Sequence, residues 1–90
     1  DGNIHTEMLR MPGMTDEEWK SATQACLREL YALSKELGGQ ISGEHGIGNG
    51  RLEFLEDFLG TPMIDLLKAV KLAFDPKLIL NPGKMIEFNR

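Results

Sequence analysis

The chain has 90 residues, of which 41% are hydrophobic, and its formal net charge is −4. This length suits one small domain with a modest core. Acidic and basic residues are interspersed, so no basic stripe predicts nucleic-acid binding. No apolar run approaches the roughly 20 residues needed to span a membrane, and no signal-peptide pattern opens the chain. We therefore expect a soluble, cytoplasmic chain without a nucleic-acid partner.

The first segment, Asp1-Gly2-Asn3-Ile4-His5, carries polar and ionisable residues around a glycine. In an extended backbone Asn3, His5 and Glu7 share one face, which predicts a short β-strand that ends at the turn Met11-Pro12-Gly13. Chain termini usually fray unless a sheet holds them. We therefore expect the numbering to begin inside a longer polypeptide, with this strand cut near its start.

A long helix is predicted between Thr15 and Gly38. Thr15 and Glu18 have the spacing of a capping box, and Gly38 offers a left-handed residue at the other end. Apolar residues recur between them at steps of three and four, which predicts a buried face: Trp19, Ala22, Cys26, Leu30, Leu33 and Leu37. The single cysteine excludes an internal disulfide, and its place on this face predicts core packing.

Two shorter helices are predicted in the second half of the chain, over residues 51–59 and 62–74, from apolar residues at helical spacing. Thr61 is expected as the N-cap of the later helix, with Pro62 at its first position. Asp75-Pro76 should end that helix, because the residue before proline is driven out of the helical region.

The glycine-rich run over residues 38–48 contains the second of two histidines. Within it Gln40-Ile41-Ser42 reads as a short strand that would pair with the first strand. Glu44 and His45 are neighbours whose side chains point to opposite sides of an extended backbone, so Glu44 could face a metal while His45 transfers a proton. Histidine and glutamate are half of a plausible divalent-metal site. Spacing alone favours the simpler alternative, a capped turn with a surface histidine.

Several motifs together resemble the carboxy-terminal part of the FAD-linked oxidases, within the vanillyl-alcohol-oxidase-like superfamily. This group includes D-lactate dehydrogenases, the glycolate oxidase flavin subunit and D-2-hydroxyglutarate dehydrogenase. The resemblance covers essentially the whole chain, in order and at family-like spacing. The motifs that carry it are Asp1-Gly2-Asn3-Ile4-His5, Gly43-Glu44-His45-Gly46-Ile47-Gly48, Phe74-Asp75-Pro76 and Leu80-Asn81-Pro82-Gly83-Lys84.

The resemblance implies a divalent-metal site, zinc or manganese, with His5 and Glu44 as ligands. A further metal histidine of the family would lie before Asp1 and is absent from this chain. His45 matches the proposed base toward the substrate hydroxyl. The implied reaction converts an alpha-hydroxy acid into a 2-keto acid as the hydride leaves for the flavin.

The resemblance also implies FAD as cofactor, with Asn81 and Lys84 near the flavin. Two positions depart from the family pattern. Glu7 stands where some members have an asparagine that helps to hold substrate, and Arg51 stands where many members have lysine. The substrate preference is therefore left open by the sequence.

These predictions describe residues 1–90 as a single partial domain of the α+β class, with two short β-strands packed on about three α-helices. The resemblance makes it part of a ferredoxin-like substrate-side domain, whose expected partner is the flavin-binding domain of the same polypeptide. The function expected is that of an FAD-dependent 2-hydroxy-acid dehydrogenase or oxidase of glycolate or D-lactate type, with an alpha-hydroxy acid as substrate. The alternative is a stand-alone metal-binding or protein-interaction module without catalytic activity.

Two further expectations concern the isolated chain and its location. The fragment by itself should be inactive, and strand edges left by the cut should promote self-association. The location is expected to be cytoplasmic, with an electron-acceptor partner as the route to the membrane periphery.

Overall fold

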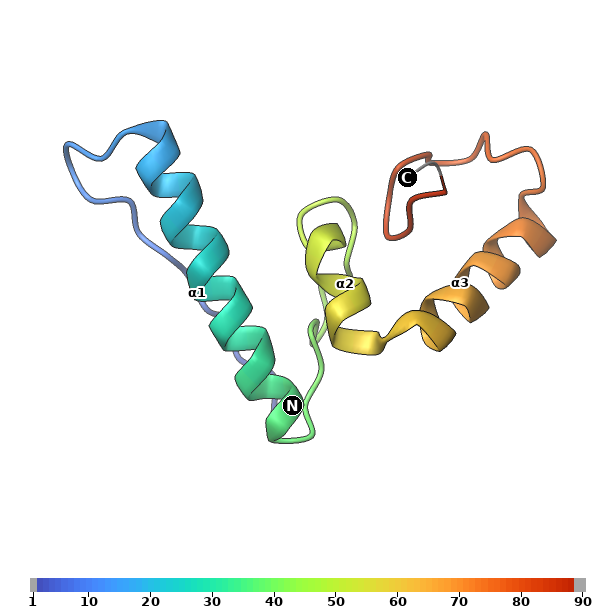
Figure 1. Cartoon of the computed structure of the whole chain (residues 1–90), viewed down its shortest axis with the longest axis horizontal. Helices are drawn as coiled ribbons and strands as arrows, with labels where there is room; N and C mark the ends of the chain where they lie inside the picture. Colours follow the sequence, from blue (N-terminus) through green and yellow to red (C-terminus); the bar gives the residue numbers. More distant parts are fainter. Residues whose placement is uncertain (1, 89–90) are drawn as a thin grey trace. The chain divides into compact units, whose positions relative to one another are not determined.

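Three helices form the regular secondary structure of residues 2–88, the part that the computed structural model of the chain describes (Figure 1). The helices are α1 (Asp16–Glu36), α2 (Leu52–Leu59) and α3 (Thr61–Phe74). The chain divides into two compact units, Asp1–Glu44 and His45–Arg90. Among the described residues, no helix combines the length and apolar character that a bilayer crossing requires.

The predicted capping box at the start of α1 is confirmed. The Glu18 amide donates to Thr15 Oγ1 at 3.1 Å, and the Thr15 amide donates to Glu18 Oε2 at 3.3 Å. Both amides would otherwise lack a partner within the helix. At the other end Gly38 has a φ of 79°, and its amide donates to the carbonyl of Lys35 at 3.1 Å. Local sequence therefore sets both ends of α1.

Thr15→Ala is expected to lower the free energy of unfolding by about 1 kcal/mol, because the Glu18 amide loses its acceptor. Urea midpoints of the 90-residue chain measure the change. Thr23→Ala is the matched control, since the Thr23 hydroxyl donates to the Lys20 carbonyl within the helix and caps no end. Equal midpoints for wild type and Thr15→Ala would remove Thr15 as the cap.

The α+β prediction is wrong, because residues 2–88 contain no β-strand. Gln40-Ile41-Ser42 and the segment before α1 are irregular. Two short strands are only marginally stable in water without a third strand or a helix that covers them. The segments still approach each other: a Cβ atom built on Gly43 would lie 2.5 Å from Asn3 Cβ. Glycine thus permits a close contact that does not require a β-ladder.

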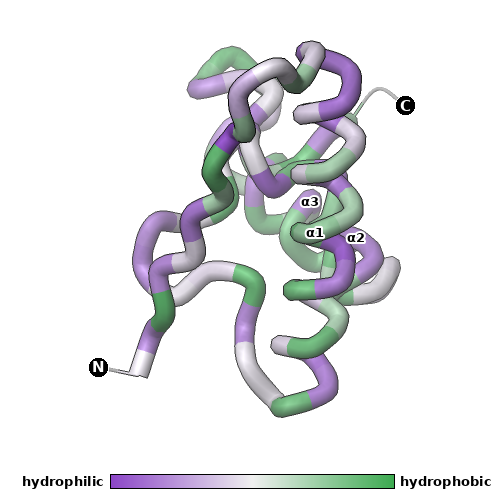
Figure 2. The backbone as a smooth tube through the Cα atoms, turned by 90° about the vertical axis from the view of Figure 1, so that its left-hand side faces the viewer, coloured by the Kyte–Doolittle hydropathy of each residue, from purple (hydrophilic) through white to green (hydrophobic). Residues whose placement is uncertain are grey.

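The expected buried face of α1 is wrong for most of its positions, since only Trp19 and Leu30 are half-buried and the other four are exposed. Tyr31 is the residue that α1 buries, with 9% of its surface exposed, and it was not on the predicted face. Cys26 is exposed, and Leu33 and Leu37 are 50% and 76% exposed. Apolar and polar stretches alternate along the helical tube in Figure 2, as the periodicity requires. The spacing therefore identified an amphipathic helix, but the described part of the first unit holds no second helix to cover it.

The core of the second unit lies between α2 and α3. Phe54 and Leu55 of α2 and Ile64 of α3 have 4%, 2% and 7% of their surface exposed. Gly60 joins the two helices with a φ of 85°, a backbone conformation that side chains disfavour. This sharp connection allows two consecutive short helices to bury apolar residues against each other.

The ends of α2 and α3 agree with the prediction, but each start differs by one residue, and the predicted N-cap of α3 is wrong. Gly60, not Thr61, precedes the first helical residue of α3, and Pro62 lies within the first turn. The Thr61 hydroxyl donates instead to Glu56 Oε1 at 3.4 Å. The positive φ of Gly60 makes the turn one residue earlier, so that Thr61 is already helical.

The tail after α3 turns back toward the loop before α2. The helix ends at Phe74, as Asp75-Pro76 predicted. Eleven residues after Phe74, the Met85 amide donates to the carbonyl of Gly48 at 2.6 Å. This bond connects the tail to the loop that begins with His45.

Candidate functional site

His5 and Glu44 come together in the first unit. Their ligand atoms belong to a group of three, completed by His45, in which all the atoms lie within 4.8 Å of one another. All three side chains are exposed. Glu44 follows Gly43, whose lack of a side chain allows the close contact with Asn3. Because Asn3 is two residues before His5, this contact brings the two ligand-bearing segments together.

The donor set fits a divalent metal. Imidazole nitrogen and carboxylate oxygen bind zinc at about 2.0–2.2 Å, so two ligand atoms on one ion lie at most about 4.4 Å apart. A spacing within 4.8 Å is thus close to that of a bound ion, and exposed side chains can adjust by small rotations. His45 follows Glu44 in the chain, and its ligand atom lies within the same distance, so an imidazole at this position could act either as a ligand or as a base.

Arg51 holds the loop that follows His45. Its Nη1 atom donates to the carbonyl of Gly46 at 2.7 Å. Gly46 and Gly48 have φ values of 76° and 55°, so glycine is needed at both positions of this turn. Arg51, one of the two departures from the family pattern, therefore stabilises the loop that follows His45.

Asn81 and Lys84 belong to a separate group in the tail. Both are exposed, and both line a cavity of about 620 Å³ between α3 and the tail. The other lining residues include the apolar Leu67 and Val70. A cavity of this size suits a small ligand or part of a cofactor, and an amide and an ammonium group can bond the polar atoms of a flavin ring. The role that the resemblance implies for Asn81 and Lys84 stays a prediction.

Asp75 is a buried charge that the sequence prediction treated only as a helix end. It is 4% exposed, and its Oδ2 atom lies 2.8 Å from Lys71 Nζ. The hydrogen bond from Lys71 lowers the pKa of the Asp75 carboxyl, and the amides of Leu80 and Ile79 lower it too, while burial acts in the opposite direction. The signal in the sequence was a lysine four residues before an aspartate at a helix end.

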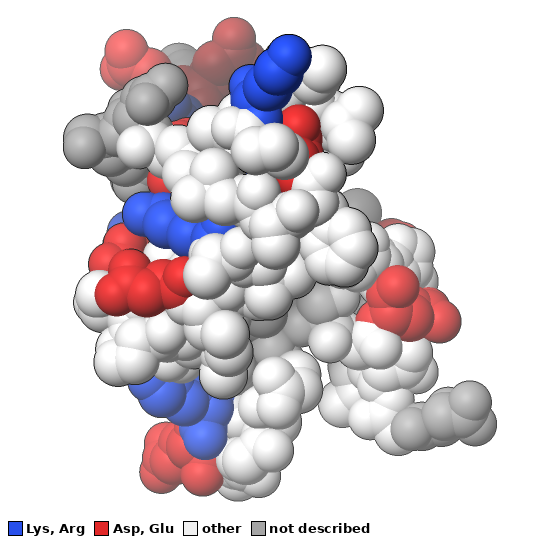
Figure 3. All heavy atoms as spheres, turned by 90° about the vertical axis from the view of Figure 1, so that its right-hand side faces the viewer, with Lys and Arg blue, Asp and Glu red and all other residues white. Residues whose placement is uncertain are grey.

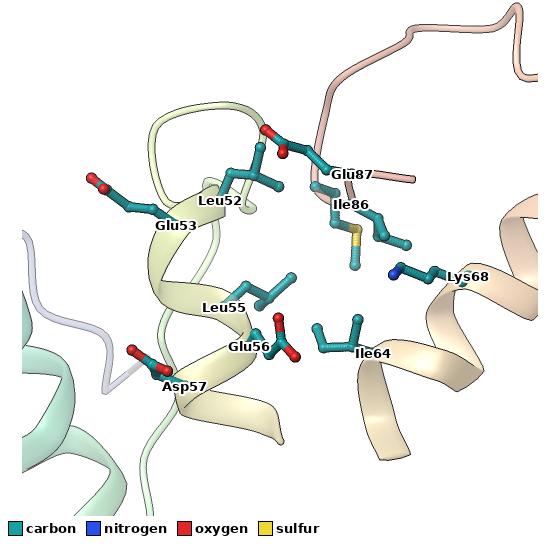
Figure 4. A pocket seen from close by; sticks show the side chains of 10 residues that line it. Leu52, Glu53, Leu55, Glu56, Asp57, Ile64, Lys68, Ile86 and Glu87 are labelled. Atoms are coloured by element: carbon teal, nitrogen blue, oxygen red, sulfur yellow. The ribbon is translucent and has the colours of Figure 1, made fainter. Parts of the chain in front are cut away.

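A smaller cavity of about 230 Å³ lies between α2, α3 and the tail. Figure 4 shows Leu55 and Ile64 on its walls, with Lys68 of α3 and Glu87 of the tail. Among the described residues that line this cavity, no second group of metal ligands is found.

The space-filling view in Figure 3 shows basic and acidic groups interspersed among neutral residues on the face that it presents.

Comparison with known proteins extends the interpretation of these residues. A model of the family "FAD linked oxidases, C-terminal domain" matches residues 1–85. The chain is 41% identical over 85 residues to D-lactate dehydrogenase of Anaerostipes hadrus and 42% identical over 85 residues to glycolate oxidase subunit GlcD of Bacillus subtilis. It is 34% identical over 85 residues to D-2-hydroxyglutarate dehydrogenase of Stutzerimonas stutzeri. Each comparison covers 94% of this chain and 18% of the relative, so the chain spans about a fifth of their length.

Proposed function

Since this chain belongs to the family of FAD-linked oxidase C-terminal domains, we propose that it is the substrate- and metal-side part of an FAD-dependent 2-hydroxy-acid dehydrogenase or oxidase. The approach of His5 to Glu44 is the observation that carries the proposal. Lactate, glycolate and 2-hydroxyglutarate, which the relatives' names contain, all carry a hydroxyl group next to a carboxylate. We propose this alpha-hydroxy acid group as the substrate class, of glycolate or D-lactate type.

His5 and Glu44 would hold a divalent metal, zinc or manganese, through an imidazole nitrogen and a carboxylate oxygen. Such an ion, when bound, supplies Lewis acidity that lowers the pKa of a substrate hydroxyl. The hydroxyl and carboxylate of an alpha-hydroxy acid offer two oxygens to such a site, which would fix the orientation of the alpha carbon. Substrate binding and orientation are therefore assigned to this pair of residues.

His45 would accept the hydroxyl proton as a general base. A bound FAD would supply the acceptor for the hydride of the alpha carbon, so that the substrate would leave as a 2-keto acid. Asn81 and Lys84 would contact the flavin from the wall of the 620 Å³ cavity. The flavin-binding domain would come from the rest of the same polypeptide, since the relatives are about five times as long as the aligned segment.

Glu44→Gln in the full-length protein is expected to empty or weaken the metal site, because the amide removes the carboxylate charge. Metal content should fall, the KM for the hydroxy acid should rise, and turnover should drop, with partial rescue by excess metal. Elemental analysis and steady-state kinetics with glycolate and D-lactate measure these changes.

Glu29→Gln is the matched control, since Glu29 is an exposed glutamate of α1 outside the ligand group. Normal metal content in Glu44→Gln would contradict the assignment of Glu44. A full-length protein that binds metal and oxidises neither acid would instead favour a non-catalytic metal-binding module.

A further inference from the structure

The carboxylate of Asp75 organises the loop between α3 and the Asn-Pro-Gly-Lys run. Its Oδ1 atom accepts the amide of Ile79 at 3.1 Å, and its Oδ2 atom accepts the amide of Leu80 at 3.0 Å. The same Oδ2 atom lies 2.8 Å from Lys71 Nζ. A buried carboxylate with these partners is fully compensated, whereas the loss of any partner would leave a buried polar group unpaired.

Lys71 also binds Leu80, whose amide is held by Asp75. Its Nζ atom donates to the carbonyl of Leu80 at 2.7 Å. Asp75 and Lys71 therefore hold both backbone polar groups of Leu80. Because the carbonyl of Leu80 belongs to the peptide that leads into Asn81, Lys71 sets the orientation of that peptide.

The residue that follows has an unusual backbone. Asn81 has a φ of 46°, in the left-handed region that asparagine enters more easily than most residues. Leu78, within the same loop, also has a positive φ, of 54°. Such angles persist where surrounding contacts over-determine the backbone. The bonds from Lys71 and Asp75 supply those contacts.

We propose that Lys71 and Asp75 are positioning residues that fix the Leu80–Asn81 peptide and thereby present Asn81 and Lys84 to the flavin. This inference rests on the proposed function, since it takes the flavin as the ligand of the tail. Lys71, Asn81 and Lys84 all line the 620 Å³ cavity, so the lysine of the ion pair faces the same cavity as the two residues that it would position.

Asp75→Asn in the full-length, FAD-loaded protein tests the proposal. The side-chain amide keeps the size of the carboxylate, but its NH₂ group cannot accept a backbone amide, so Ile79 or Leu80 loses its acceptor. We expect FAD affinity to fall by about tenfold or more, with a shift of the visible flavin bands. FAD affinity and the flavin spectrum are measured on variant protein whose circular dichroism spectrum shows that it is folded.

Lys71→Met should act in the same direction, and the double variant should be no worse than the more damaging single variant, because the two residues act through one loop. Lys71→Arg should retain most of the affinity, since it keeps a charged donor. Asp65→Asn, at an exposed aspartate of the same helix, should leave flavin binding unchanged.

The outcomes separate this inference from the proposed function. Additive effects of the two single variants, or an Asp75→Asn protein that is less stable but binds FAD normally with unshifted bands, would overturn the positioning role. Unchanged flavin binding and spectra in both Asn81→Ala and Lys84→Met would instead overturn the flavin contact itself. Hydrogen exchange at the Ile79 and Leu80 amides tests directly whether Asp75 holds the loop. Faster exchange in Asp75→Asn would support that role of Asp75, and unchanged exchange would overturn it.

Discussion

His45→Asn in the full-length enzyme is expected to lower turnover by about 10²–10⁴-fold while metal content stays near that of the wild type. Asparagine keeps a polar side chain of similar reach but cannot accept the hydroxyl proton as an imidazole does. Single-turnover measurement of flavin reduction isolates the step that should slow. Elemental analysis of the same preparation gives the metal content.

His5→Asn is the matched comparison, because it changes the other histidine in the same way. There we expect loss of metal, together with a raised KM for the hydroxy acid. All three possible ligands, His5, Glu44 and His45, lie within 4.8 Å, so geometry alone leaves His45 able to serve in either role. Loss of metal in His45→Asn with metal retained in His5→Asn would reverse the two roles.

Gly43→Ala is expected to weaken metal binding by about 10–100-fold, the range found when residues that orient metal ligands are changed. An added Cβ would lie 2.5 Å from Asn3 Cβ, an atom fixed to the backbone that cannot rotate away. The two segments must therefore separate, which moves Glu44 away from His5. Metal titration by calorimetry on the full-length protein measures the loss.

Two further variants make this prediction specific. Asn3→Gly in the Gly43→Ala background removes the opposing Cβ and should restore most of the metal affinity. Gly50→Ala is the control, since a Cβ there would meet nothing within 4 Å and the φ of Gly50 is not in the left-handed region. A Gly43→Ala protein with wild-type affinity would show that this close approach does not shape the metal site.

The sequence predicted those parts of the fold that depend on neighbouring residues. The capping box at Thr15 and the end of α3 before Pro76 both involve contacts within a few positions, so spacing sufficed to locate them. The buried face of α1 and the two strands depend on what packs against them, which spacing cannot supply. Leu37 has the right period for a core position and is 76% exposed.

The same distinction applies to the candidate site. Motif resemblance identified His5, Glu44 and His45, and the structure brings their ligand atoms together without the strand pairing that had been expected to do so. The contact between Gly43 and Asn3 and the two bonds of Lys71 were not predicted, because they depend on the path of the backbone between distant positions. The roles assigned to His5, Glu44 and His45 stay predictions, which the variants described above test.

The bond between the Met85 amide and the Gly48 carbonyl also bears on the order of folding. Joined by Gly60, α2 and α3 can pack soon after they form, because their contacts are local. The tail must close a much longer loop to reach Gly48, and that entropy cost places its docking late. Segments that dock late on few contacts are among the first to open in the native state. We therefore expect the loop that follows His45 to exchange its amide hydrogens sooner than the α2 and α3 core.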